Sequence, residues 1–143
     1  MKYKMLPLFI IFLFIQILTI NSQDINIIPK PQDFSFGRSN VVINDDTIII
    51  NSLESETSAK LLQDHFKEKY SLNLEATEFQ SLKKNAINFK VDKNLTNEDY
   101  ELTISDQGIT ICALDDRGWF YAVQSLIQYC SSNAYFSNNM KKL

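Results

Sequence analysis

The sequence has 143 residues, and its 17 aspartates and glutamates outnumber its 14 lysines and arginines, giving a formal net charge of −3 at pH 7. A chain of this length has room for one domain. Its runs of basic residues are limited to the pairs Lys83-Lys84 and Lys141-Lys142. Because nucleic-acid binding depends on a basic surface, this composition argues against a nucleic-acid partner.

The first 22 residues have the order typical of a secretory signal peptide. Lys2 and Lys4 precede an apolar run from Met5 to Ile20, after which polar residues begin. A run of about 16 residues is shorter than the roughly 20 that a membrane-spanning helix needs. We therefore expect cleavage before Gln23, which removes two lysines and no acids and changes the net charge from −3 to −5. The alternative is an uncleaved anchor that holds a surface domain on the membrane.

Passage through the secretory pathway would expose the chain to glycosylation and oxidation. Asn94-Leu95-Thr96 is an N-glycosylation acceptor between two predicted strands, so we expect Asn94 to carry a glycan.

In an oxidising compartment Cys112 and Cys130 can pair if a helix packs on its preceding strand. Each cysteine also lies within an apolar pattern, and a free cysteine often serves as a small buried hydrophobic residue. We therefore favour two free thiols over a disulfide.

The predicted elements begin with a stretch that resists helix formation. Prolines at positions 29 and 31 favour an extended, edge-like course for the segment DINIIPKPQDFSFG, residues 24–37. Val41–Ile43 and Thr47–Ile50 are rich in β-branched residues and predict two strands. Residues 72–79 and 86–91 are weaker strand candidates.

A helix is predicted from Ser52 or Ser55 to about Tyr70, since either serine can cap it. Its apolar stripe at helical spacing consists of Ala59, Leu62, Phe66 and Tyr70. His65 is the only histidine and lies one position off that stripe. With no second histidine or cysteine at ligand spacing, we interpret His65 as a packed or half-exposed residue and not as a ligand or base.

The stretch DYELTISDQGITICALDDRGWFYAVQSLIQ, residues 99–128, contains the clearest local signals. Residues 100–104 and 109–113 alternate as half-buried strands do, and the Gly-containing connection 105–108 predicts a hairpin. Asp115 or Asp116 can cap a following helix. Its apolar face is formed by Trp119, Val123, Leu126 and Cys130, with Phe120 and Ile127 beside them.

This order of elements predicts an α+β domain with one largely antiparallel or mixed sheet and two helices packed on one face. The signal peptide is expected to end at residue 22 and the domain to span residues 23–130. Residues 131–143 are expected to form a poorly ordered tail.

The sequence has no pattern typical of an active site. Gly37, Gly108 and Gly118 are too far apart for a phosphate-binding loop, and no Cys/His cluster offers a metal site, so we expect no cofactor and no metal. Adjacent carboxylates act as an acid/base pair only in a pocket that separates their pKa values, and turns and helix caps rarely provide such a pocket. We therefore interpret the acidic pairs of this sequence as solvated charges. The acidic pairs are Asp45-Asp46, Glu98-Asp99 and Asp115-Asp116.

Two stretches resemble the N-terminal domain of family 20 glycoside hydrolases, the β-N-acetylhexosaminidases. IIPKPQDFSF, residues 27–36, is similar to the opening of that domain, and residues 99–128 are similar to its end. The matching positions of the second stretch are Tyr100, Leu102, Ile104, Ile109, Ile111, Ala113, Gly118, Phe120 or Tyr121, Gln124, Ser125, Leu126 and Gln128. Ala122 departs from the glycine that family members often have there.

The resemblance implies a sheet backed by two helices that precedes a catalytic (β/α)8 barrel. In the family the barrel removes terminal N-acetylhexosamine from glycoconjugates or chitin-type glycans, with the substrate acetamido group as nucleophile beside an Asp-Glu pair. This sequence has no Asp-Glu dipeptide and no His-x-Gly-Gly-Asp-Glu motif, and a barrel would need at least about 200 further residues. The chain alone is therefore expected to be inactive.

Two functions follow as alternatives. The first is a non-catalytic support domain of a secreted or lysosomal β-N-acetylhexosaminidase, which meets glycans only through the barrel and membranes only through its signal segment. The second is a stand-alone secreted binding or inhibitor module. For the first, we expect the helix side that carries Tyr121, Gln124, Ser125 and Gln128 to face a neighbouring domain, although those residues would also suit a helix face exposed to water.

Overall fold

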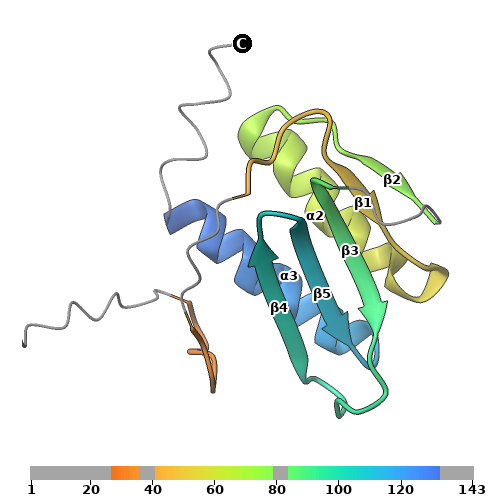
Figure 1. Cartoon of the computed structure of the whole chain (residues 1–143), viewed down its shortest axis with the longest axis vertical. Coiled ribbons are helices and arrows are strands. Elements are labelled where there is room, and N and C mark those ends of the chain that lie inside the picture. The colour runs from red at the N-terminus through yellow and green to blue at the C-terminus, as the bar shows by residue number, and fades with distance from the viewer. Residues whose placement is uncertain (1–26, 36–40, 79–83, 133–143) are drawn as a thin grey trace, which may run out of the picture.

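The computed structural model describes residues 27–35, 41–78 and 84–132. Within these ranges a five-stranded sheet in the order β2-β1-β3-β5-β4 carries two helices on one face, as Figure 1 shows. The predicted α+β fold is confirmed. The elements are β1 (Ile48–Ile50), η2 (Leu53–Ser55), α2 (Glu56–Tyr70), β2 (Glu75–Thr77), β3 (Ala86–Val91), β4 (Tyr100–Ser105), β5 (Gly108–Ala113) and α3 (Asp116–Ser132).

The sheet is mixed, and most of its pairings are parallel. Strand β1 pairs in parallel with β2 and β3, and β3 pairs in parallel with β5. Helix α2 crosses from β1 to β2, a connection that parallel neighbours require. The antiparallel pairing is the hairpin of β4 and β5, in which Ser105 is opposite Gly108. The predicted hairpin is therefore confirmed, while the three other pairings in the described sheet run parallel.

Glycine at position 108 is required by both conformation and space. Its φ is +130°, which residues with a side chain rarely adopt, and an added Cβ would lie 2.4 Å from the Ala86 carbonyl oxygen. Strand β5 can therefore begin its parallel pairing with β3 directly after the hairpin turn.

Both serines proposed as caps lie at the start of the first helical segment. Ser52 precedes the 3₁₀ turn η2, and its backbone N–H donates to Ser55 Oγ at 3.0 Å. Ser55 is the N-cap residue of α2, which ends at Tyr70 as predicted.

The alternating residues of β1, β3 and β5 meet the helices in one core. Its largest fully buried side chains include Trp119, Phe66, Ile43, Ile49, Leu62, Ile87, Ile109, Ile111 and Leu126.

Two predicted strands differ from the structure, and so does the stretch predicted to be extended near the N-terminus. Val41–Ile43 forms no strand and leads into a turn at residues 44–47, in which the Thr47 N–H donates to the Asn44 carbonyl at 2.9 Å. Ile43, just before this turn, is fully buried in the core. The described residues 27–35 contain bends and no strand. Of the candidate 72–79, the structure shows only the short strand β2, and Phe79 lies outside the described residues.

The signal segment and residues 133–143 also lie outside the described residues. Helix α3 ends at Ser132, two residues beyond the predicted end of the domain. No helix in the described ranges is long and apolar enough to cross a membrane.

Candidate functional site

The start of α3 is fixed by Asp115, which resolves the choice between the two predicted cap residues. Asp115 Oδ1 accepts hydrogen bonds from the backbone N–H groups of Arg117 at 3.2 Å and Gly118 at 3.3 Å. These N–H groups have no partner within the helix, and a carboxylate at this end also complements the helix dipole. The local sequence thus positions α3 against the end of β5.

Gly118 lets the first turn of α3 approach the sheet closely. An added Cβ at this position would lie 2.4 Å from the Asp99 carbonyl oxygen and 2.7 Å from Ala113 Cβ. Neither atom belongs to the flexible end of a side chain, so a larger residue would force the helix away from β4 and β5. The glycine of the family-like motif therefore has a packing role.

Ser125 does not lie on a free helix surface, which corrects the prediction for this residue. Its side chain is 4% exposed, and its Oγ lies 2.6 Å from the Tyr100 hydroxyl on β4. A buried hydroxyl needs a hydrogen-bond partner, and Tyr100 supplies one across the helix–sheet interface. Sequence reasoning missed this pair, although both residues belong to the same motif.

Gln128 joins the two stretches that carry the family resemblance. Its Oε1 accepts a hydrogen bond from the Ile28 backbone N–H at 2.9 Å, and its Nε2 donates to the Ile28 carbonyl at 3.0 Å. Ile27 beside this contact is buried, whereas the Ile28 side chain is 82% exposed. The predicted interface residue Gln128 therefore binds the N-terminal stretch of its own domain.

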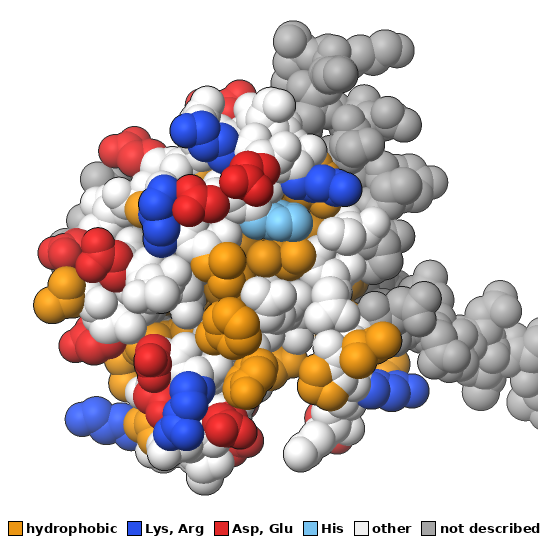
Figure 2. Space-filling view, turned by 180° about the vertical axis from the view of Figure 1, so that it is seen from behind, with side chains coloured by type: hydrophobic (Ala, Val, Ile, Leu, Met, Phe, Trp, Pro, Cys, Tyr) orange, Lys and Arg blue, Asp and Glu red, His pale blue; other side chains and the backbone are white. Residues whose placement is uncertain are grey.

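The remaining predicted interface residues keep an outward position on α3. Tyr121 is 40% exposed, and its ring contacts that of Phe120 edge to face at 5.7 Å. Phe120 is 45% exposed, and Gln124 is half-buried. Figure 2 shows hydrophobic side chains gathered on the helix-bearing side of the molecule. Phe120, Tyr121 and Gln124, which we call the outer row of α3, are available to a neighbour.

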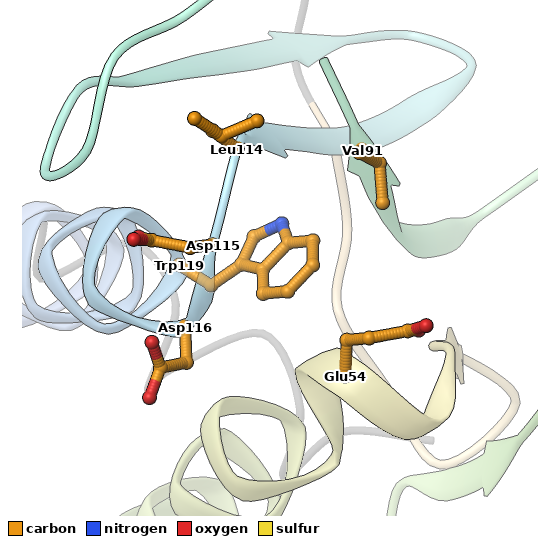
Figure 3. Close-up of a pocket in the computed structure, with 6 residues that line it drawn as sticks. All are labelled: Glu54, Val91, Leu114, Asp115, Asp116 and Trp119. Carbon is orange, nitrogen blue, oxygen red and sulfur yellow. The ribbon is translucent and has the colours of Figure 1, made fainter. Parts of the chain in front are cut away.

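A shallow depression of about 440 Å³ lies where β3 and β5 end and α3 begins. It is lined by Glu54, Val91, Leu114, Asp115, Asp116 and Trp119. Figure 3 shows that the three carboxylates point in different directions around the Trp119 indole. An acid/base pair must converge on one reacting bond, and these side chains do not.

The pKa of Asp115 is shifted in the wrong direction for a general acid. Desolvation acts to raise it, but hydrogen bonds from Gly118 and Arg117 and the Arg117 charge outweigh desolvation and lower the pKa. A general acid at neutral pH needs a raised pKa. A lowered pKa instead suits the role of Asp115 as a helix cap, because the ionised carboxylate interacts most favourably with the N-terminal end of a helix.

The other acidic pairs also have structural contacts. Asp45 Oδ1 accepts a hydrogen bond from the Asn73 backbone N–H, and Asp99 accepts two from Thr96. Glu98 pairs with Arg117 at 3.5 Å, with both side chains more than half exposed. Among the described residues no group of three or more His, Cys, Asp or Glu side chains could hold a metal ion.

His65 is packed, as its position beside the apolar stripe predicts. Its ring meets those of Phe66 and Tyr70 edge to face at 6.0 and 5.9 Å. Its Nε2 is buried, and the described part of the chain offers that atom no hydrogen-bond partner. Desolvation lowers the pKa of His65, with a further decrease from Lys69 and an opposing effect of Glu68. The neutral ring therefore suits this site.

Cys112 and Cys130 are both free thiols. Cys130 belongs to the core between the helices and the sheet, whereas Cys112 alternates with the core residues Ile111 and Ala113 and so points to the other face of the sheet. The sheet separates the two side chains, which is why the pairing considered from the sequence does not form. Burial raises the pKa of Cys130 to about 12. Cys112 is only half-buried, so the interpretation of two buried thiols holds for Cys130 alone.

Asn94 lies in the exposed loop between β3 and β4. Its backbone N–H and its Nδ2 both donate to Asp92 Oδ1 at 2.9 Å. The exposed position leaves room for a glycan, and the modification itself stays a prediction.

Comparison with known proteins gives three consistent findings. The family model for glycosyl hydrolase family 20, domain 2, matches residues 24–140. A β-hexosaminidase from Porphyromonas gingivalis is 30% identical over 119 residues, which cover 81% of this chain and 15% of that protein. The solved structure of an inactive mutant of a family 20 exo-β-N-acetylglucosaminidase from Vibrio harveyi has a TM-score of 0.58 at 20% identity, covering 70% of this chain and 15% of that one.

The likeness to the Vibrio harveyi structure shows a shared fold, and the family match extends over most of the chain, from before the described residues to beyond α3. The chain spans about 15% of the length of the curated relative that it matches. On the strength of the family match, which includes both motif stretches, the chain belongs to glycosyl hydrolase family 20 and corresponds to its domain 2.

Proposed function

We propose that the chain is the non-catalytic support domain of a longer β-N-acetylhexosaminidase whose (β/α)8 barrel acts on terminal N-acetylhexosamine of glycoconjugates or chitin-type glycans. The observation that carries the proposal is how the motif residues are used. Gly118 allows close packing, Ser125 binds Tyr100, and Gln128 binds Ile28. These residues hold the domain together, and none of the three lines the depression beside Trp119.

The outer row of α3 is the surface that we assign to contact with the barrel. Phe120 and Tyr121 are large aromatic side chains, each at least 40% exposed, on a helix whose opposite side is fully buried. Exposed aromatic residues are enriched where one protein surface meets another. Gln124 lies between them and Gln128 along the helix and adds a polar side chain to the row.

We further propose that the protein is made through the secretory pathway and reaches the extracellular space or the lysosome. Expressed in a secreting eukaryotic cell, the chain should begin at Gln23 and gain a glycosidase-sensitive mass at Asn94, because the acceptor sequence lies on an exposed loop. Intact-mass and N-terminal peptide analysis measure both features. A protein that starts at Met1 and partitions with membranes would contradict cleavage, and a mass unchanged by glycosidase would contradict glycosylation.

The purified chain should hydrolyse a chromogenic N-acetylglucosaminide no faster than background. The family mechanism needs one carboxylic acid to protonate the leaving oxygen and a second carboxylate to hold the acetamido group, both fixed in a walled pocket. In the described residues the carboxylates of Glu54, Asp115 and Asp116 diverge around an open depression. The measurement is release of the chromophore by the chain at micromolar concentration.

A longer gene product, identified by reading the transcript past codon 143, is the positive control and should turn the same substrate over. Turnover that co-purifies with the short chain and disappears in Glu98→Gln, Asp99→Asn, Asp115→Asn or Asp116→Asn would show that this domain is catalytic. A stop directly after codon 143 in the natural transcript would instead favour the stand-alone binding module.

A further inference from the structure

The acceptor sequence Asn94-Leu95-Thr96 spans two successive turns in the loop between β3 and β4. In the first turn the Leu95 N–H donates to the Asp92 carbonyl at 3.4 Å. In the second turn the Asp99 N–H donates to the Thr96 carbonyl at 3.1 Å. Figure 1 shows this loop at the end of the sheet opposite the turn of the β4–β5 hairpin. Asn94 therefore belongs to one turn, and Thr96 begins the other.

One aspartate in each turn binds a polar side chain of the acceptor sequence. Asp92 Oδ1 accepts hydrogen bonds from Asn94 Nδ2 and from the Asn94 backbone N–H, each at 2.9 Å. Asp99 Oδ2 accepts one from the Thr96 backbone N–H at 3.2 Å and another from the Thr96 hydroxyl. The hydroxyl has a single proton to donate, and Asp99 takes it. Both polar side chains of the acceptor sequence are thus bound in the folded loop, although they are exposed.

The ends of the loop are held by residues that follow the acceptor sequence in the chain. The Asp92 N–H donates to the Ala113 carbonyl at 2.9 Å, which fixes the start of the loop against the end of β5. At the other end the Asp99 carbonyl oxygen lies so close to Gly118 that an added Cβ would be 2.4 Å from it. Since Ala113 and Gly118 are synthesised after Asn94, the loop cannot reach this conformation while the acceptor sequence is first leaving the ribosome.

Glycan transfer uses the groups that the two aspartates bind. Transfer from a lipid-linked glycosyl pyrophosphate joins Asn94 Nδ2 to C1 of the sugar and breaks the bond between C1 and the pyrophosphate, which leaves with the electron pair. One Nδ2 proton passes to a base of the transferase. The acceptor sequence also requires a hydroxyl residue at its third position, here Thr96. The folded loop must therefore release both side chains before a transferase can bind them.

We infer that Asp92 and Asp99 form a lock on the modification site at Asn94, so that the glycan is transferred while the loop is open and the folded domain resists transfer. The relevance of the lock in the cell rests on the proposed secretory route. The two aspartates are positioning residues, because they hold the acceptor side chains and take no part in the transfer. A chain that folds before it meets the transferase stays unmodified at Asn94.

The first experiment uses the folded chain, purified without a glycan from bacteria. It is incubated with a eukaryotic oligosaccharyltransferase and a lipid-linked oligosaccharide, and mass spectrometry gives the initial rate of modification. Asp92→Ala and Asp99→Ala should each be modified about fivefold faster than the parent, the change that corresponds to a hydrogen bond worth about 1 kcal/mol. The matched control is Asp106→Ala, which removes an exposed aspartate from the β4–β5 turn and should leave the rate unchanged.

Equal rates for the parent, Asp92→Ala and Asp99→Ala, including no transfer to any of them, would overturn the inference. The same acceleration in Asp106→Ala would also overturn it, because the loss of negative charge would then be the cause. Far-UV circular dichroism checks that each variant is folded. If an alanine variant fails to fold, Asp92→Asn or Asp99→Asn replaces it, since asparagine fills the same space but loses the charge that strengthens these bonds.

The second experiment expresses the parent and Asp92→Ala in a secreting eukaryotic cell and measures the fraction of secreted chain that carries a glycan. Both should be largely modified, because the transferase meets Asn94 before the loop closes. A secreted parent that lacks the glycan would overturn the timing, whatever the variant shows. Chains that remain inside the cell without a glycan would contradict the proposed secretory route and leave the first experiment intact.

Discussion

Replacing Trp119 by alanine should lower the free energy of unfolding by about 3–5 kcal/mol, a large part of the 5–15 kcal/mol typical of a whole domain. The indole is 1% exposed and belongs to the core between α3 and the sheet, so its removal leaves a cavity. Its Nε1 also donates to the Lys90 carbonyl at 3.3 Å, which ties the first turn of α3 to the end of β3. Urea denaturation followed by far-UV circular dichroism measures the loss.

Phe120→Ala is the matched control, since it removes an aromatic ring from the next position of the same helix. That ring is 45% exposed, so its loss should change stability by less than about 1 kcal/mol. If Trp119→Ala does not fold at all, Trp119→Phe keeps an aromatic ring, loses the hydrogen bond, and should be destabilised by an intermediate amount. Equal stabilities for the Trp119 and Phe120 variants would contradict the assignment of Trp119 to the core.

Replacing Gly118 by alanine should also destabilise the domain, by about 1–3 kcal/mol, the usual cost of overpacking. The direction is informative because alanine within a helix is normally about 1 kcal/mol more favourable than glycine. Here the added Cβ would lie 2.4 Å from the Asp99 carbonyl oxygen and 2.7 Å from Ala113 Cβ, so α3 must shift. The same urea titration measures this effect.

Two further variants test the explanation for Gly118. Arg117→Ala changes the neighbouring, exposed position of the helix and should have a small effect, because surface ion pairs contribute little. Adding Ala113→Gly to Gly118→Ala should relieve the second contact and recover part of the stability. A Gly118→Ala variant as stable as the parent would mean that the helix does not need its close approach to β4 and β5.

Local sequence patterns determined the parts of the fold whose contacts are close in the chain. The hairpin of β4 and β5 follows from two alternating runs around a glycine, and α3 follows from an acidic cap and an apolar stripe. The range of β3, a weaker candidate, was also predicted correctly, because Ile87, Phe89 and Val91 alternate with other residues over one short run. Periodicity and caps act over a few residues, so a single sequence contains them in full.

The sheet order and the contacts of motif residues were decided only by the tertiary structure. No local pattern indicates that β3 lies between β1 and β5 or that these strands run parallel. Ser125 looks like a surface residue in the sequence because it is polar, but it lies on the flank of α3 that meets Tyr100. The partner of Gln128 is a backbone segment 100 residues away. Such contacts depend on how distant elements pack, and packing becomes visible only when the whole chain is folded.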